Sequence, residues 1–154
     1  MYSVDVVNEY LDRNGQPHET TWSGIDDFMC KAFKAARDAA HPDMELFYND
    51  FNIDAMSGWQ KTKSDAVFNM LKAMKAKGDE CPIDGIGFQT HIDLDFGKYI
   101  DSVRLNIQRY AEIGIKVHFT EVDIKCRRED GVCIDAVWSS EDLQTQADLY
   151  SQLL

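Results

Sequence analysis

The amino-acid sequence predicts an α/β fold in which parallel strands alternate with crossover helices. Short apolar runs of strand length recur along the chain, and segments of helical period separate them. The strand starts recur roughly every 30 to 40 residues, as expected of consecutive β/α units. With 154 residues, the chain has the size of one ordinary domain.

Four apolar runs predict the strands of a parallel sheet. Each is short and nearly continuously apolar, which is typical of strands that are buried on both faces. The runs are "VDVV" at 4–7, "ELFY" at 45–48, "IGFQ" at 86–89 and "KVHFT" at 116–120.

Helical periodicity follows each of these strands. The four predicted apolar faces consist of Ile25, Phe28, Met29, Ala32, Phe33 and Ala36; Val67, Leu71 and Met74; Ile100, Val103, Ile107 and Ala111; and Leu143, Ala147, Tyr150 and Leu154. Ser140 is the expected N-cap of the last helix. Gly78 and Gly114 follow the second and third patterns, where a left-handed residue often closes a helix.

The net charge of the chain is −11, from 27 acidic and 16 basic residues. This charge argues against a nucleic-acid partner, because phosphate binding depends on clustered lysine and arginine. The sequence contains no apolar run of membrane-spanning length and no visible signal-peptide pattern. We therefore expect no nucleic-acid and no membrane partner.

The four cysteines do not have the spacing of a zinc site. Cys126 and Cys133 flank the segment "RREDGV", in which Asp130 and Gly131 can form a turn. Such a turn can bring the two sulfurs together. A disulfide between them and a pair of free thiols are both compatible with the sequence.

Polar side chains follow each predicted strand, at the edge where parallel α/β folds bind their ligands. They are Asn8 and Glu9, Asn49 and Asp50, Gln89 and His91, and Glu121 and Asp123. Two carboxylates at one rim suit glycoside hydrolysis, in which one protonates the leaving oxygen and the other attacks the anomeric carbon or activates water. This chemistry requires no cofactor and no metal. Taken singly, however, a carboxylate at a strand end is more often a solvated residue or a helix cap.

Four sequence blocks together resemble a known enzyme family. The blocks "VDVVNE", "LFYNDFNID", "PIDGIGFQTHI" and "VHFTEVDI" occur in the order and at the spacing of the glycoside hydrolase family 10 endo-1,4-β-xylanases. The resemblance covers nearly the whole chain and implies a (β/α)8 TIM-barrel fold with a retaining mechanism.

The resemblance also implies a role for each rim residue. Glu9 matches the general acid/base and Glu121 matches the nucleophile. Asn8 resembles the residue that hydrogen-bonds the sugar 2-hydroxyl. His91 is similar to the histidine that contacts the nucleophile, and Asp123 to the acid that orients it. The remaining matches are Gln89 beside them, and Tyr48 and Asn49 on the leaving-group side of the cleft.

The resemblance predicts a partial barrel. It begins at the fourth barrel strand and stops at the helix after the seventh, so residues 1–154 are expected to form about four β/α units of a catalytic domain. Val4 stands where the family usually has tryptophan. The sequence leaves open whether Trp22, Trp59 and Trp138 are sugar platforms or packing residues.

The expected ligand is xylan or a xylo-oligosaccharide, and the family resemblance implies a secreted enzyme. Two alternatives remain open: a cellulase or mannanase with a related barrel, and a non-catalytic fragment that binds sugar or assembles with another chain. Open sheet edges would favour self-association or pairing with a complementary barrel fragment.

Overall fold

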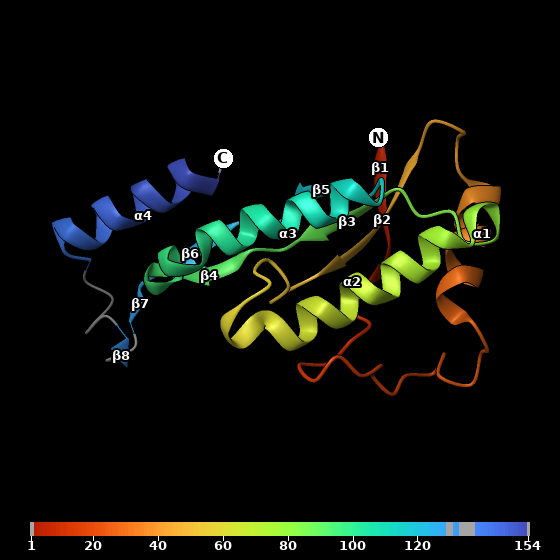
Figure 1. Ribbon diagram of the computed structural model, residues 1–154, viewed down its shortest axis with the longest axis horizontal. Coiled ribbons are helices and arrows are strands. Elements are labelled where there is room, and N and C mark those ends of the chain that lie inside the picture. Colours follow the sequence, from red (N-terminus) through yellow and green to blue (C-terminus); the bar gives the residue numbers. More distant parts are fainter. Residues whose placement is uncertain (1, 129–130, 133–137, 154) are drawn as a thin grey trace.

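A parallel four-stranded sheet forms the centre of the protein (Figure 1). The computed structural model describes residues 2–128, 131–132 and 138–153. The strands lie in the order β1-β2-β3-β5, and each neighbouring pair is parallel. The predicted α/β class and its four strands are thus confirmed, with the bounds β1 (Ser3–Asn8), β2 (Glu45–Asp50), β3 (Gly85–Phe88) and β5 (Lys116–Phe119).

Helices connect these strands and cover one face of the sheet (Figure 1). α2 and α3 lie side by side, since the rings of Phe68 and Tyr110 meet edge to face with centroids 5.3 Å apart. The α-helices are α1 (Phe28–Ala39), α2 (Lys61–Ala76), α3 (Ile100–Glu112) and α4 (Ser140–Leu153). Short 3-10 helices are η1 (Gly58–Gln60), η2 (Gly78–Glu80) and η3 (Leu94–Tyr99).

Short strands form two further, two-stranded sheets among the described residues. β4 (His91–Asp93) continues the chain after β3, and β6 (Asp123–Lys125) continues it after β5. These two strands pair in parallel, with His91 opposite Asp123. A further antiparallel pair consists of β7 (Arg127–Arg128) and β8 (Gly131–Val132).

The main hydrophobic core lies between the sheet and the first three helices. Its fully buried members include Phe33 from α1, Leu71 from α2 and Tyr110 from α3, packed against Leu46 and Ile86 of the sheet. A second apolar cluster joins β4, β6, η3 and α4. The periodic residues predicted for α2, namely Val67, Leu71 and Met74, are all buried.

The predicted helix ends and faces are correct in part. Gly78 and Gly114 have φ angles of 58° and 70°, so both predicted left-handed closures are confirmed. The predicted face of α4 is wrong in part: Leu143 is 52% exposed and Leu149 is buried, whereas the predicted Tyr150 packs against the second apolar cluster. The predicted Leu154 lies outside the described residues.

The predicted N-cap of α4 is also wrong, because Ser139 and not Ser140 caps the helix. The hydroxyl of Ser139 accepts a hydrogen bond from the Asp142 backbone N–H, and the Asp142 carboxylate accepts one from the Ser139 N–H in return. The sequence offered two adjacent serines, and only the first one has an acid three residues later.

A disulfide that the sequence did not reveal links Cys30 in α1 to Cys81 after η2. Both sulfurs are buried in the main core. The predicted partner of Cys126, Cys133, lies outside the described residues, so that pairing stays a prediction.

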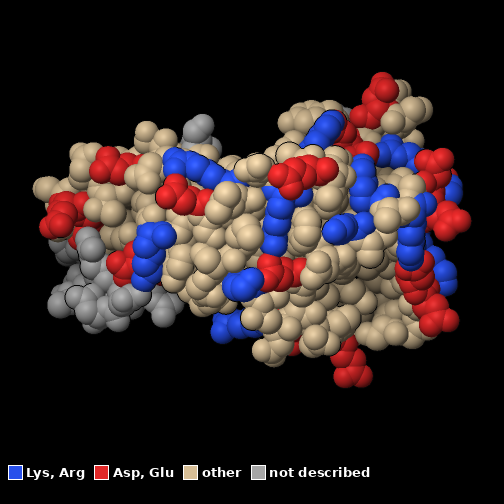
Figure 2. Space-filling view, viewed as in Figure 1, with Lys and Arg blue, Asp and Glu red and all other residues tan. Residues whose placement is uncertain are grey.

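Acidic and basic side chains are interspersed over the face shown in Figure 2, and many of them gather at the end that carries α1. Among the helices that the structure describes, none combines the length and apolar character that a membrane crossing needs.

Candidate active site

The predicted rim residues meet at the carboxyl edge of the sheet. Glu9 directly follows β1, Gln89 follows β3, and Glu121 lies between β5 and β6. Backbone hydrogen bonds fix these junctions: the Glu9 N–H donates to the Asn49 carbonyl at 2.9 Å, and the Gln89 N–H donates to the Asp50 carbonyl at 3.0 Å. Side chains distant in sequence are therefore held at one place by neighbouring strands.

A continuous chain of carboxamides connects the two candidate catalytic glutamates. Gln89 Nε2 donates to Glu9 Oε1 at 2.9 Å and to Asn8 Oδ1 at 3.2 Å. Asn49 Nδ2 donates to the same Asn8 oxygen at 3.1 Å and to Glu121 Oε1 at 2.9 Å. Because amide N–H groups donate to both carboxylates, the network fixes the positions of Glu9 and Glu121.

His91 connects Glu121 to Asp123. His91 Nδ1 lies 2.5 Å from Asp123 Oδ2, while Nε2 lies 3.4 Å from Glu121 Oε2. The register of β4 and β6 explains this contact, since it sets His91 and Asp123 opposite each other. An acid on Nδ1 keeps a proton there and orients the ring toward Glu121.

Three non-glycine residues at this edge have left-handed backbone conformations, which are unfavourable for residues with a side chain. Glu9, Asn52 and Thr90 have φ angles of 53°, 59° and 59°. Each lies shortly after one of the strands β1, β2 and β3, and such residues persist only where the surroundings hold them. The Thr90 hydroxyl donates to the buried Asp54 carboxylate at 2.6 Å, which supports the turn that presents His91.

The glycine at position 87 makes room for the carboxamide network. A Cβ atom added to Gly87 would lie 2.3 Å from Asn49 Oδ1 and 2.9 Å from Thr120 Cγ2. The Thr120 hydroxyl donates to Asn49 Oδ1 at 2.8 Å, which sets the amide so that its nitrogen points at Glu121. The "GIGF" motif thus contributes space as well as a strand.

Tyr48 supports the site from beneath and does not line the cleft. Its side chain is fully buried. The expected position on the leaving-group side of the cleft is therefore wrong for this residue, because Tyr48 packs in the core between sheet and helices, whereas the neighbouring Asn49 faces Glu121. Burial, followed by the charge of Asp50, raises the pKa of the Tyr48 hydroxyl, so the group remains protonated.

A further carboxylate, on Asp5 of β1, is electrostatically coupled to Glu121. Burial, followed by the negative charge of Glu121, raises the pKa of Asp5, and His118 opposes this shift. Asp5 has no signal in the sequence that marks it as a site residue, because it lies inside β1 and not at its end.

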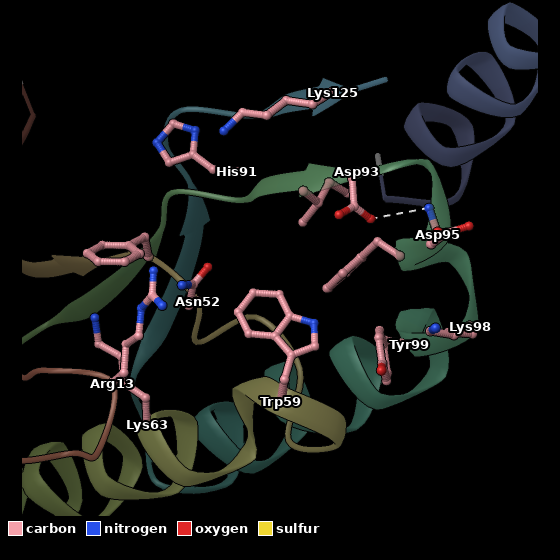
Figure 3. A pocket seen from close by; sticks show the side chains of 13 residues that line it. Arg13, Asn52, Trp59, Lys63, His91, Asp93, Asp95, Lys98, Tyr99 and Lys125 are labelled. Carbon is pink, nitrogen blue, oxygen red and sulfur yellow. Dashed lines mark hydrogen bonds between the residues drawn. The ribbon is translucent and has the colours of Figure 1, made fainter. Parts of the chain in front are cut away.

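A cavity of about 670 Å³ opens beside His91 (Figure 3). The indole of Trp59 stands at its floor, with His91 and Lys125 on the strands across the hollow. Asn52 and Tyr99 also contribute to its wall. Trp59 is 58% exposed, and an open aromatic face beside polar groups is typical of a sugar-binding surface.

The other two tryptophans lie elsewhere. Trp22 stacks on Phe28, with ring centroids 6.1 Å apart, and Trp138 packs against the second apolar cluster. Neither lines the cavity. In the part of the chain that the structure describes, no group of three or more His, Cys, Asp or Glu side chains is arranged to hold a metal ion.

Comparison with known proteins identifies the family. The model of the family "Glycosyl hydrolase family 10" matches residues 1–154. An endo-1,4-beta-xylanase A of Thermoanaerobacterium saccharolyticum is 37% identical over 97% of this chain, and an exoglucanase XynX of Acetivibrio thermocellus is 36% identical over 97%. The chain spans only 12% of the length of each of these relatives.

A solved structure has the same fold. The crystal structure of TsXylA, described as an intracellular xylanase from T. saccharolyticum, matches 99% of this chain with a TM-score of 0.81 and 35% identity. The match covers 43% of that chain. A mutant of TsXylA was crystallised in complex with xylotriose.

The TsXylA description overturns the expectation of a secreted enzyme, which came from the family resemblance alone. A relative at 35% identity is described as intracellular, so the family by itself does not imply secretion. The predicted family and barrel type are confirmed. With a family match over its whole length and xylanase relatives above 35% identity, the chain belongs to glycosyl hydrolase family 10.

Proposed function

We propose that residues 1–154 form the part of an endo-1,4-β-xylanase barrel that carries both catalytic carboxylates. The segment corresponds to the fourth to seventh strands of the eight-stranded barrel. The observation that carries the proposal is the unbroken hydrogen-bond chain from Glu9 through Gln89, Asn8 and Asn49 to Glu121. Its substrate is xylan or a xylo-oligosaccharide.

The first half of the proposed reaction forms a covalent intermediate. Glu121 attacks the anomeric carbon of the sugar, and Glu9 gives its proton to the leaving glycosidic oxygen. Asn8 hydrogen-bonds the 2-hydroxyl, an interaction that strengthens as positive charge develops on the ring. His91, held by Asp123, keeps Glu121 oriented toward the anomeric carbon.

The second half releases the sugar with retained configuration. Glu9, now ionised, takes a proton from water, and that water attacks the anomeric carbon and breaks the bond to Glu121. The cavity lined by Asn52 and Trp59 beside His91 is suited to the sugars on the leaving-group side. No step requires a cofactor.

Activity on two polysaccharides tests this function. In a complete barrel in which residues 1–154 replace the matching segment of TsXylA, we expect hydrolysis of xylan well above that of carboxymethylcellulose, measured as released reducing sugar. A preference for carboxymethylcellulose would favour a cellulase, a possibility that the name of the XynX relative supports. Sugar binding without turnover would favour a non-catalytic role.

We propose that strands from another chain or segment complete the barrel. β1 and β5 form the two edges of the main sheet, and their backbone groups are available for further pairing. For the 154-residue chain by itself we expect self-association or poor stability and very low xylanase activity. A monodisperse monomer of 17.6 kDa in light scattering, with full xylanase turnover, would contradict this proposal.

A further inference from the structure

A buried lysine lies beneath the catalytic edge. Lys63 of α2 has a side chain that is only 2% exposed, and its Nζ atom lies 2.6 Å from Oδ1 of the fully buried Asp50. The same nitrogen lies 3.8 Å from the centre of the Phe51 ring. Both partners of this ion pair are therefore removed from water, apart from a small contact of Lys63 with the cavity.

Stability alone does not explain this ion pair. The cost of removing two charges from water often equals or exceeds their attraction, so apolar residues of similar size are usually as stable. Burial raises the pKa of Asp50, and hydrogen bonds from Lys63 and then Tyr48 oppose that shift. The ion pair with Lys63 thus opposes the effect of burial on the Asp50 carboxylate.

The Asp50 carboxylate determines how the Tyr48 hydroxyl is used. That hydroxyl donates to Asp50 Oδ2 at 2.5 Å. Because its proton is committed to the carboxylate, the oxygen presents a lone pair in the other direction, where it accepts the backbone N–H of Tyr10 at 3.0 Å. A chain of polar contacts thus runs from Lys63 to the peptide that follows Glu9.

That peptide requires support, because Glu9 has a φ angle of 53°. The conformation costs free energy for a residue with a side chain and persists only where neighbours hold it. Two bonds from β2 do so: the Asn49 carbonyl accepts the Glu9 N–H, and the Tyr48 hydroxyl accepts the N–H of Tyr10.

We propose that Lys63 and Tyr48 are positioning residues for Glu9. They act through the backbone: Lys63 pairs with the Asp50 carboxylate, Asp50 orients the Tyr48 hydroxyl, and Tyr48 anchors the turn that carries the acid/base. The inference rests on the proposed function, because it assigns to Glu9 the acid/base role.

Amide hydrogen exchange in the complete barrel that contains residues 1–154 tests the structural half of the inference. In Tyr48→Phe, the Tyr10 N–H loses its acceptor, and we expect its exchange to accelerate about 10-fold while amides in α3 change little. The double variant Asp50→Asn/Lys63→Met, which removes both buried charges together, should accelerate the same amide by a smaller factor.

Two matched controls separate this effect from general destabilisation. Tyr110 is a fully buried tyrosine whose hydroxyl has no hydrogen-bond partner among the described residues, so Tyr110→Phe removes the same atom without breaking a bond. Lys61→Met removes an exposed lysine of the same helix that pairs with Asp65. Both controls should leave Tyr10 exchange unchanged. Equal acceleration in Tyr48→Phe and Tyr110→Phe would overturn the inference.

Kinetics in the complete barrel test the functional half. An aryl xylobioside with a dinitrophenolate leaving group needs little protonation, so its kcat/KM should stay within about 2-fold of the wild type in Tyr48→Phe. For unactivated xylo-oligosaccharides, kcat/KM should fall about 10-fold, because the proton donor is misplaced. Equal losses on both substrates would contradict a positioning role. Absence of xylan hydrolysis by the wild-type barrel would instead refute the proposed function and leave the exchange result to stand.

Discussion

Removal of the Cys30–Cys81 disulfide should destabilise the fold strongly. This bond joins α1 to the segment between η2 and β3, and 51 residues separate the two cysteines in sequence. The closed loop contains all of β2 and α2. The crosslink therefore restricts the unfolded chain over about a third of its length. Neither cysteine is one of the rim residues.

The loop length gives the expected magnitude. In the chain-entropy account, closing a loop of 51 residues restricts the unfolded state by an amount equal to about 4 kcal/mol at 25 °C. Measured effects are commonly 2 to 4 kcal/mol, which is a large part of the stability of an ordinary domain. Cys30→Ala/Cys81→Ala should lose somewhat more than reduction, because it also removes buried sulfur atoms from the core.

Urea unfolding followed by far-ultraviolet circular dichroism measures this loss. The oxidised wild type is compared with the reduced wild type and with Cys30→Ala/Cys81→Ala. Adding reductant to the double variant is the control, because any remaining change then arises from other cysteines. If the urea midpoint shifts by an amount that corresponds to less than about 1 kcal/mol in the free energy of unfolding, and the m value is unchanged, the reasoning about loop closure is refuted.

Four further predictions concern the catalytic edge and the neighbouring cavity within a complete barrel. Glu121→Ala should abolish turnover on all substrates, whereas Glu9→Ala should spare kcat/KM for aryl xylosides with good leaving groups. In a crystal structure, the two carboxyl groups should lie about 5 to 5.5 Å apart, and a separation near 9 Å would indicate an inverting enzyme. Trp59→Ala should raise KM for long xylo-oligosaccharides about fivefold with kcat unchanged, and an unchanged KM would remove Trp59 from the substrate path. Gly87→Ala should displace the Asn49 carboxamide and lower kcat/KM on xylan about 100-fold. The activity assay is accompanied by a thermal-unfolding measurement, in which the variant should match the wild type.

The sequence predicted the strands and the rim residues because both follow from simple periodicity. Continuous apolar runs are short enough to be strands, and parallel strands all end at the same edge. The order of the four blocks then distinguished Glu9 and Glu121 from ordinary solvated carboxylates. Left-handed closure after α2 and α3 was also visible, since glycine is the residue that adopts it without cost.

Other features depend on three-dimensional neighbours and have no local signal. Four cysteines allow three pairings, and the spacing does not select Cys30 with Cys81. From the sequence, Lys63 is expected to be an ordinary surface lysine of a helix. Its burial against Asp50 is visible only in the structure. For Tyr48, the alternation of side chains along a strand predicts that Tyr48 and Asn49 point to opposite faces of the sheet. The sequence does not indicate which of these faces is the cleft and which is the core.

The four strands and the residues that directly follow them carry the carboxamides that join the two glutamates. Glu9 follows β1 and Glu121 follows β5, and the carboxamides that join them come from Asn8 of β1, Asn49 of β2 and Gln89 after β3. These hydrogen bonds run without interruption from Glu9 to Glu121. The distance between the carboxylates is therefore a property of this segment, whereas affinity for the sugar chain depends also on surfaces that other barrel strands provide. A loss of substrate binding and a loss of catalytic geometry are thus separable in family 10 barrels that carry this segment, and variants of Asn49 or Gln89 should affect kcat more than KM.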